Sequence, residues 1–352
     1  MTHRPSIFMR TLSTPLILIL ILACFLVLAT VVNSGPFNQV VIDALVKVIL
    51  VVGLYVFIGN SGVISFGHIG FTCLGAYATA WLTIPPMMKK MALPGLPDLI
   101  LESKLPFGIA IILGGLFVAL FALVVGKILM RLSGIAASIA TFAMLAVINA
   151  VYSNWERVTG ATSSVVGIPI VRVVWPYFLA AAAAILIAHL YAISRSGLAL
   201  RAARDEAIAA SASGVDIGRE RLIAFVISAF ITGLGGALSA HSVGVVTPDT
   251  FYLNLTFICL SMLVVGGMNS LSGAVMGVVV LSVIIQILRQ FEKGVDLNGT
   301  VLAIPNGLQE ITIGIVMVFI LIARPSGLTR NTEIVWRGWP FKAFLRQRSP
   351  DG

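Results

Sequence analysis

The chain has 352 residues, of which 59% are hydrophobic and only 11% are charged, and its mean hydropathy is +1.04. Soluble domains carry roughly 25% charged residues, so this composition excludes an ordinary soluble enzyme and indicates a membrane protein with several spans. The formal net charge of +9 is best explained by cationic loops that face anionic lipid, so membrane lipid is an expected partner and nucleic acid is not.

Ten apolar segments are predicted to cross the membrane, and they must be helical because lipid offers no partners to free backbone groups. They lie at 15–33, 40–58, 63–84, 106–126, 133–152, 177–194, 222–241, 252–267, 270–289 and 307–323. The first could instead be a signal peptide, but its long apolar run without a small-residue cleavage site favours an uncleaved span. The predicted fold is an all-α polytopic membrane protein with about ten transmembrane helices. Residues 1–323 form one transmembrane domain, and 324–352 form a basic cytoplasmic tail.

Two charged residues, Asp43 and Lys47, lie four positions apart within the second segment. Ionisable residues inside spans are functional candidates by default, although the spacing favours pairing between these two over a substrate role. Glu310 lies early in the last segment, where a carboxylate suits a helix N-terminus. It is also the best proton-relay candidate if an ion gradient drives transport.

The third segment is rich in small and polar residues where a helix facing lipid would carry Leu. Interrupted spans of this kind often line the substrate route of transporters, and helix packing explains them equally well. Tyr55 precedes the segment, and Thr159 and Gly160 follow in a later loop. The candidate translocation path therefore comprises Tyr55, Ser65, Gly67, His68, Thr159 and Gly160.

A charged, Ala-rich segment from Arg201 to Gly214 lies between two apolar spans, within the connection 195–221. Its composition favours a helix with Gly214 as its stop, and a polar helix must lie outside the hydrocarbon. Small residues would let a partner's surface approach closely, so docking is preferred over a plain solvated loop. The candidate docking residues are Arg201, Arg204, Asp205, Glu206, Ala207, Ala209, Ala210 and Gly214.

Small residues recur in the later spans. Ser228, Thr232, Gly236 and Ala240 follow one another at four-residue spacing, which predicts close helix packing along one ridge. The short connection at 267–271 predicts an antiparallel hairpin between its flanking spans.

The distribution of Lys and Arg predicts the orientation of the chain. Segments on the side of the N-terminus, the 195–221 connection and the tail carry 15 Lys and Arg, against seven on the other side. By the positive-inside rule both termini and the docking segment are expected in the cytoplasm.

A nucleotide-binding loop is missing from the sequence. Gly126-Lys127 is followed by Ile128 and lacks the preceding glycine of a P-loop. No catalytic or metal-ligand pattern emerges either, so neither enzymatic activity nor a cofactor is predicted. Energy for transport must come from a partner or from an ion gradient.

Five runs, in order, resemble the permease family of branched-chain amino acid ABC importers. The runs are Gly62-x-x-Ser65-x-Gly67-His68 with Gly75-Ala76-Tyr77; Thr159-Gly160 through Gly167-Ile168-Pro169; Ser196-Gly197 through the docking segment; Gly266-Gly267-Met268-x-Ser270-Leu271-x-Gly273; and Arg324-Pro325-Ser326-Gly327-Leu328. The resemblance implies an ABC importer permease fold in the bacterial cytoplasmic (inner) membrane. It also implies partners: ABC ATPase subunits, a second permease subunit (homologous or identical), and a periplasmic or lipid-anchored solute-binding protein.

Several departures from the family pattern leave the solute open. Tyr55 stands where the family usually has Asn, and Ala161 and Ser164 replace glycines. Branched-chain or other apolar amino acids are the leading expectation, with urea or another small solute on the same machinery as the alternative. An ion-coupled secondary transporter is a further alternative, and recovery of an ATPase with the chain would separate it from the first two.

Overall fold

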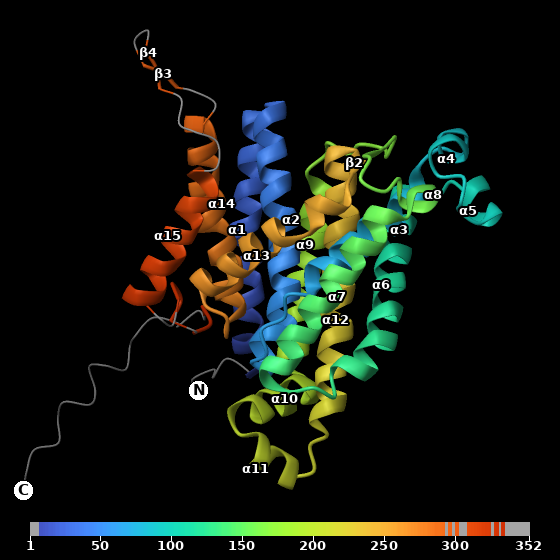
Figure 1. The fold of residues 1–352 in the computed structure, drawn as a ribbon. Helices are drawn as coiled ribbons and strands as arrows, with labels where there is room; N and C mark the ends of the chain where they lie inside the picture. The colour runs from blue at the N-terminus through green and yellow to red at the C-terminus, as the bar shows by residue number, and fades with distance from the viewer. Residues whose placement is uncertain are drawn as a thin grey trace, which may run out of the picture.

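The computed structural model describes residues 7–292, 295–297, 300–302, 308–324, 327–330 and 332–334. Within these ranges the chain is almost entirely helical and forms one elongated bundle (Figure 1). The only strands described form two short antiparallel pairs, β1 (Val165–Val166) with β2 (Val245–Val246) and β3 (Val295–Leu297) with β4 (Thr300–Leu302). The predicted all-α polytopic fold is confirmed.

Long helices run back and forth along the bundle, and shorter ones lie at its ends (Figure 1). The long helices are α1 (Ile7–Val32), α2 (Gly35–Ser61), α3 (His68–Thr83), α6 (Phe107–Leu129), α7 (Gly134–Asn154), α9 (Trp175–Ile193), α12 (Ile217–Val243), α13 (Leu253–Gly266), α14 (Leu271–Glu292) and α15 (Leu308–Ala323). At one end lie α4 (Pro86–Ala92), α5 (Asp98–Glu102), α8 (Glu156–Thr159) and β2, which the 3-10 helix η1 (Pro248–Phe251) follows along the chain. The opposite end carries α10 (Arg195–Asp205) and α11 (Ala207–Ala212).

Each predicted span coincides with one of the long helices. In the described part of the chain, eight segments are long and apolar enough to cross a membrane, whereas α3 and α15 have only 16 residues each. The third span begins later than predicted, because Gly62 ends α2 in the left-handed conformation, with φ +71°, and α3 starts only at His68. Since α3 is buried among other helices rather than exposed to lipid, it need not match the full thickness of the bilayer.

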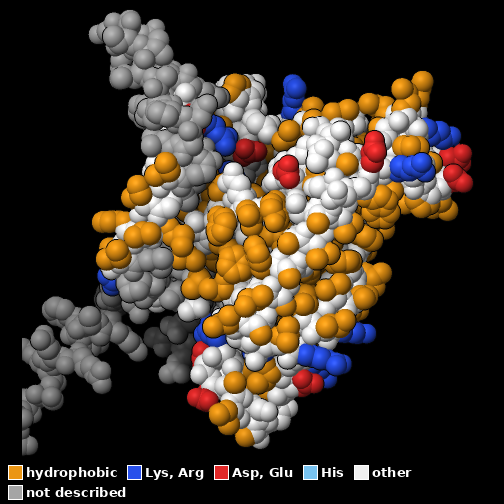
Figure 2. All heavy atoms as spheres, in the orientation of Figure 1, with side chains coloured by type: hydrophobic (Ala, Val, Ile, Leu, Met, Phe, Trp, Pro, Cys, Tyr) orange, Lys and Arg blue, Asp and Glu red, His pale blue; other side chains and the backbone are white. Residues whose placement is uncertain are grey.

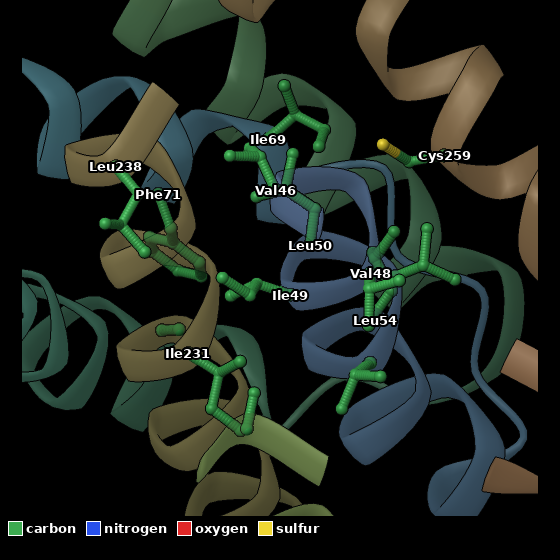
Figure 3. Close-up of a cluster of buried hydrophobic side chains, with 14 of the residues drawn as sticks. Val46, Val48, Ile49, Leu50, Leu54, Ile69, Phe71, Ile231, Leu238 and Cys259 are labelled. Atoms are coloured by element: carbon green, nitrogen blue, oxygen red, sulfur yellow. The ribbon is translucent and has the colours of Figure 1, made fainter. Parts of the chain in front are cut away.

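Helix α2 forms the centre of the bundle. Its apolar window is 83% buried, against 28% for the windows in α1, α6 and α7. Figure 3 shows its side chains, Val46, Ile49 and Leu50 among them, packed between α12 and α13. A helix that is apolar on all sides is expected at such a position, whereas a helix at the periphery shows one face to lipid.

The periphery of the bundle is apolar too. Side chains such as Leu120, Val124 and Ile139 are more than 60% exposed. On the face shown in Figure 2, hydrophobic side chains form a broad belt and charged side chains gather at the two ends. This distribution is expected of a surface in contact with lipid.

Close helix contact at small residues holds α12 against α2 and α3. The Ser228 hydroxyl donates a hydrogen bond to the Gly53 carbonyl, with an oxygen–oxygen distance of 2.6 Å. A Cβ at Gly53 would lie 2.6 Å from a Thr232 methyl, and one at Gly236 would overlap the Thr72 carbonyl. The predicted packing ridge of α12 is confirmed.

The predicted hairpin between α13 and α14 is confirmed, and residues 327–330 and 332–334 are attached to its turn. The Glu333 carboxylate accepts hydrogen bonds from the backbone N–H groups of Leu271 and Ser272, at 2.7 and 3.0 Å. It therefore caps the N-terminus of α14, where a negative charge is favoured by the helix dipole. The Leu328 N–H donates to the Val265 carbonyl at 2.9 Å. The described residues of the first part of the predicted tail are thus part of the folded unit, while Pro325, Ser326, Asn331 and 335–352 lie outside the described residues.

Candidate docking and translocation sites

The segment predicted to dock a partner forms two short helices at one end of the bundle (Figure 1). The Ser194 side chain caps α10 by accepting a hydrogen bond from the Gly197 N–H at 3.1 Å. Glu206 is extended, with φ −150° and ψ 96°, and separates α10 from α11. Gly214 follows α11 at φ +86°, a conformation that favours glycine, which explains its position at the end of the segment.

Helix α11 and the residue before it present an exposed surface. Glu206, Ala207 and Ala209 are exposed, and Ile208 between them is 81% exposed, while Ala210 is buried. An isoleucine side chain in water on a segment outside the apolar belt has an unfavourable hydration free energy. A surface of small residues with one exposed aliphatic side chain and one carboxylate is suited to contact with another protein.

The arginines of the segment point toward the bundle rather than away from it. Arg204 donates to the Gly59 carbonyl at 2.6 Å and to the Asn269 side-chain oxygen at 3.3 Å. Arg201 lies 3.3 Å from the Asn60 side-chain oxygen. These bonds join α10 to the last turn of α2 and to the α13–α14 turn, so Arg201 and Arg204 connect the exposed surface to the central helix.

Ser65 and His68 of the candidate path lie together in the interior. The Ser65 hydroxyl is 2.7 Å from Nδ1 of His68, and both side chains are fully buried. The His68 ring packs among Phe57, Phe71 and Phe225, with ring centroids 5.3–5.7 Å apart. A Cβ at neighbouring Gly67 would lie 2.6 Å from the Thr141 carbonyl oxygen. In this conformation the segment is closely packed.

The remaining path residues lie elsewhere. Tyr55 is buried at the inner part of α2, and its ring covers Gly59. The Thr159 hydroxyl is 2.6 Å from the Tyr152 carbonyl oxygen, and Gly160 ends α8 at φ +73°. Helix α8 is fixed to Trp81, whose indole donates to the Val158 carbonyl at 3.0 Å. Since Trp81 and His68 are 13 residues apart on one helix, these groups are about 20 Å apart.

Two larger cavities lie beside α2. The first, with a volume of about 340 Å³, lies among α1, α2 and α14 and has only uncharged lining residues, among them Leu22, Phe25 and Val279. The second has the same volume and lies among α2, α12, η1, α13 and α14. Its lining includes four charged side chains, Asp43, Lys47, Asp249 and Arg289.

The structure shows no direct ion pair between Asp43 and Lys47, although the charge of Asp43 does interact with Lys47. The Asp43 carboxylate lies 4.0 Å from the Arg289 guanidinium of α14, and no ion pair or hydrogen bond joins Lys47 to any residue that the structure describes. Asp43 therefore lies closer to Arg289 on the facing helix than to Lys47, one turn away on its own helix. Sequence reasoning missed Asp249 and Arg289, since nothing in their surroundings marks them as neighbours of α2. The Glu310 side chain lies outside the described part of the chain.

Comparison with known proteins gives a consistent result. Residues 36–321 match the family described as "Branched-chain amino acid transport system / permease component". The chain is 25% identical to the "High-affinity branched-chain amino acid transport system permease protein LivM" of Escherichia coli (strain K12), over 94% of this chain and 78% of that protein. The protein of the same name from Salmonella typhimurium (strain LT2) gives the same values. No solved structure matches the chain.

Proposed function

Because the chain belongs to the family of branched-chain amino acid transport permease components, we propose that it is the permease subunit of an ABC importer for branched-chain or other apolar amino acids. As a family member it is a transport subunit with several membrane-spanning helices, not a catalytic enzyme. The proposal adds that ATP hydrolysis in separate subunits drives the transport, and that the membrane is the bacterial inner membrane. The described helices that carry this proposal are those of the exposed α10–α11 segment.

The proposed partners follow the geometry of the two ends. ATPase subunits would bind at α10 and α11 in the cytoplasm, with both termini on the same side. A periplasmic or lipid-anchored binding protein would approach the end that carries α4, α5 and η1. A second permease, identical or homologous, would complete the pore. The Lys and Arg bias of the sequence supports this orientation.

The proposed docking surface consists of Glu206, Ala207, Ile208 and Ala209. The ATPase would contact this surface, and Arg201 and Arg204 would transmit its movement to α2 and to the α13–α14 turn. In this interpretation the carboxylate of Glu206 is free to pair with the partner, because the described structure gives it no ion pair. This division between contact residues and transmitting residues supports a coupling helix more than a solvated loop.

The experiment uses the complete transporter reconstituted in proteoliposomes. We expect Glu206→Arg and Ile208→Asp to lower solute-stimulated ATP hydrolysis about ten-fold or more, as is typical for loss of a central interface contact. The matched control is Glu102→Arg, because Glu102 is exposed at the opposite end and has only a surface ion pair with Lys90. Undiminished coupling in both docking variants would overturn the proposal, as would a failure of any ATPase to purify with the chain.

The route of the solute remains a prediction. We propose that it runs beside α2 past Tyr55 and the Ser65–His68 segment, with Thr159 and Gly160 contributing at the far end of α3. Since Ser65 and His68 are closely packed, such a route requires α2, α3 and α12 to separate during transport. Ser65→Leu should block uptake, and Tyr55→Asn should shift preference within a panel of amino acids and urea. Wild-type rates and preferences in both variants, at equal membrane levels, would place the route elsewhere.

A further inference from the structure

We propose that the cavity lined by Asp43, Lys47, Asp249 and Arg289 is a binding site for a zwitterionic amino acid with an aliphatic side chain. This proposal rests on the proposed function and names the groups that would receive the solute within the permease. The cavity has a volume of about 340 Å³, at the lower end of the range of about 300–1,000 Å³ that is typical of small-molecule sites.

The charges of this cavity match a zwitterion. Asp43 and Lys47 come from α2, Arg289 from α14 and Asp249 from η1, and together they carry no net charge. A ligand with one carboxylate and one ammonium group can pair with one cation and one anion of this set. Lys47 is available to a ligand, because its only favourable charge interaction with a described residue's carboxylate is with Asp43 and no direct ion pair is formed. Charge left without a partner in a membrane-spanning region is costly.

The existing ion pair leaves room for such a ligand. Asp43 and Arg289 are 4.0 Å apart, and their side chains are 37% and 42% exposed. An ion pair of this length and exposure contributes little, so exchange of each partner for a ligand group has a small free-energy cost. Asp249 is exposed and has no ion pair in the described structure. A neutral solute such as urea could hydrogen-bond to these groups but could not neutralise Lys47.

Apart from its charged groups, the lining of the same cavity is mostly aliphatic. Its apolar lining comprises Val46, Leu50, Val243, Leu255, Ile258 and Ile285. Figure 3 shows Val46 and Leu50 close to each other on α2, within the buried core. A ligand whose charged groups remain near Lys47 would therefore place an aliphatic side chain against Leu50 and Ile258. Burial of such a side chain is worth about 1.5–3 kcal/mol in general, which favours branched aliphatic over polar amino acids.

The position of the cavity suits a solute arriving from the end opposite α10 and α11. Val243 is the last residue of α12, and Asp249 and Thr250 belong to η1, which follows the strand β2 at that end. Leu50, at the inner part of the lining, is the sixteenth of the 27 residues of α2. The cavity thus extends from the end of the bundle past the midpoint of its central helix. Tyr55, which belongs to the predicted translocation path, lies further along the same helix. The cavity and the proposed route therefore follow α2 in the same direction.

The first test is protection of an introduced cysteine, which requires neither ATP nor an ATPase. Val243 and Val245 are both exposed, at 57% and 37%, but only Val243 lines the cavity. Each is changed to Cys in the full transporter, in a Cys24→Ser background because Cys24 is exposed. Labelling by a thiol reagent is then measured in membranes with leucine, leucinamide or urea as the probe.

Leucine should slow the labelling of Val243→Cys by the factor 1 + [leucine]/Kd, while leucinamide and urea have no such effect and Val245→Cys is unaffected. Adding Lys47→Gln or Arg289→Gln should raise the Kd about ten-fold or more, as expected for loss of one charge-assisted hydrogen bond. Lys90→Gln changes an exposed lysine outside the cavity and should leave the Kd for leucine unchanged. Equal protection by urea, or no protection by leucine up to its solubility limit, would overturn the proposal.

The second measurement separates this proposal from the function on which it rests. ATP-driven leucine uptake by the reconstituted wild type tests the pump, and its KM in Lys47→Gln tests the site. If ATP-driven uptake occurs with an unchanged KM and leucine gives no protection, the proposed function stands and the proposed binding site is wrong. If leucine protects the cysteine but no ATP-driven uptake occurs, the proposed binding site stands and the proposed function is wrong.

Discussion

Gly236 of α12 shows how little space separates the central helices. Any Cβ at this residue would overlap the Thr72 carbonyl oxygen of α3, and backbone cannot give way as the end of a flexible side chain can. We expect Gly236→Ala to lower the free energy of unfolding by about 1–3 kcal/mol, or more if α3 cannot move. The measurement is the midpoint of thermal unfolding of the purified protein in detergent.

Gly108 of α6 serves as the matched control, because a Cβ there has nothing within 4 Å. Gly108→Ala should leave the midpoint unchanged or raise it slightly, since alanine has the higher helix propensity. Similar losses from both substitutions would show that glycine content as such, rather than the contact with Thr72, determines stability.

The backbone of Ala161 is strained. It stands where the family usually has glycine, and its φ is +53°, a left-handed conformation that L residues other than Gly, Asn and Asp adopt at a cost of about 1–2 kcal/mol. Ala161→Gly should therefore raise the unfolding midpoint by the equivalent of about 0.5–1 kcal/mol, after the greater entropy of glycine in the unfolded chain is subtracted.

A helical alanine provides the comparison for this substitution. Ala202 is exposed within α10, where a change to glycine should destabilise by about 1 kcal/mol. Opposite signs for Ala161→Gly and Ala202→Gly are expected in the same assay. Equal and negative effects would mean that the turn at residue 161 tolerates its conformation without strain.

At the level of elements, Glu333 holds the described tail segment against the α13–α14 turn. Its carboxylate accepts two backbone N–H groups and the Ser272 hydroxyl, the last at 2.7 Å. Glu333→Gln removes the charge at the N-terminus of α14, which is worth about 0.5–1 kcal/mol. We expect faster cleavage by trypsin at Arg330, measured by limited proteolysis. Glu102→Gln, which removes only an exposed pair with Lys90, should leave the cleavage rate at Arg330 unchanged.

Periodicity and apolar length were sufficient to predict which segments are helical. They predicted less well where the helices begin and end. The α13–α14 hairpin follows from a connection too short for anything else, and the ridge of small residues on α12 follows from four-residue spacing. The beginning of α3 could not be predicted, because it depends on the left-handed conformation of Gly62. The break at Glu206 was also missed, since an extended residue between two helices leaves no compositional sign.

The candidate sites also differ in how far they could be predicted from the sequence. The exposed segment around Glu206 could be predicted because a polar stretch between apolar spans must lie outside the lipid. Asp43 and Lys47 were recognised as candidates, but their neighbours Asp249 and Arg289 are more than 200 residues away in sequence. Only the packing of α2 against α13 and α14 brings these four side chains to one cavity. Such juxtapositions are a property of the folded bundle and have no counterpart in a local pattern.

For the molecule as a whole, orientation is the simplest property to test. Reporter fusions placed within 206–214 should report the cytoplasm, whereas fusions within 86–102 should report the opposite side, since these segments lie at opposite ends of the bundle (Figure 1). Lys89 fixes the second of these segments, 86–102. Its ammonium group donates to the carbonyls of Trp81, Ile100 and Ser103, and burial lowers its pKa. These bonds join residues 81 to 103, so an insertion within 86–102 lengthens the chain between bonded residues. The same side for both reporters would contradict the proposed topology.

The bond between Glu333 and α14 also bears on how the protein is made. Leu271 leaves the ribosome 62 residues before Glu333, so α14 enters the membrane while the N–H groups of its first turn have no carboxylate to accept from them. At that stage the hairpin relies on its other contacts, among them the close approach of Gly266 to Gly273 and Gly277. The cap of α14 therefore forms late, when the chain beyond α15 returns to a turn that was inserted much earlier. A transporter halted before residue 333 would contain every long helix and still be incompletely assembled.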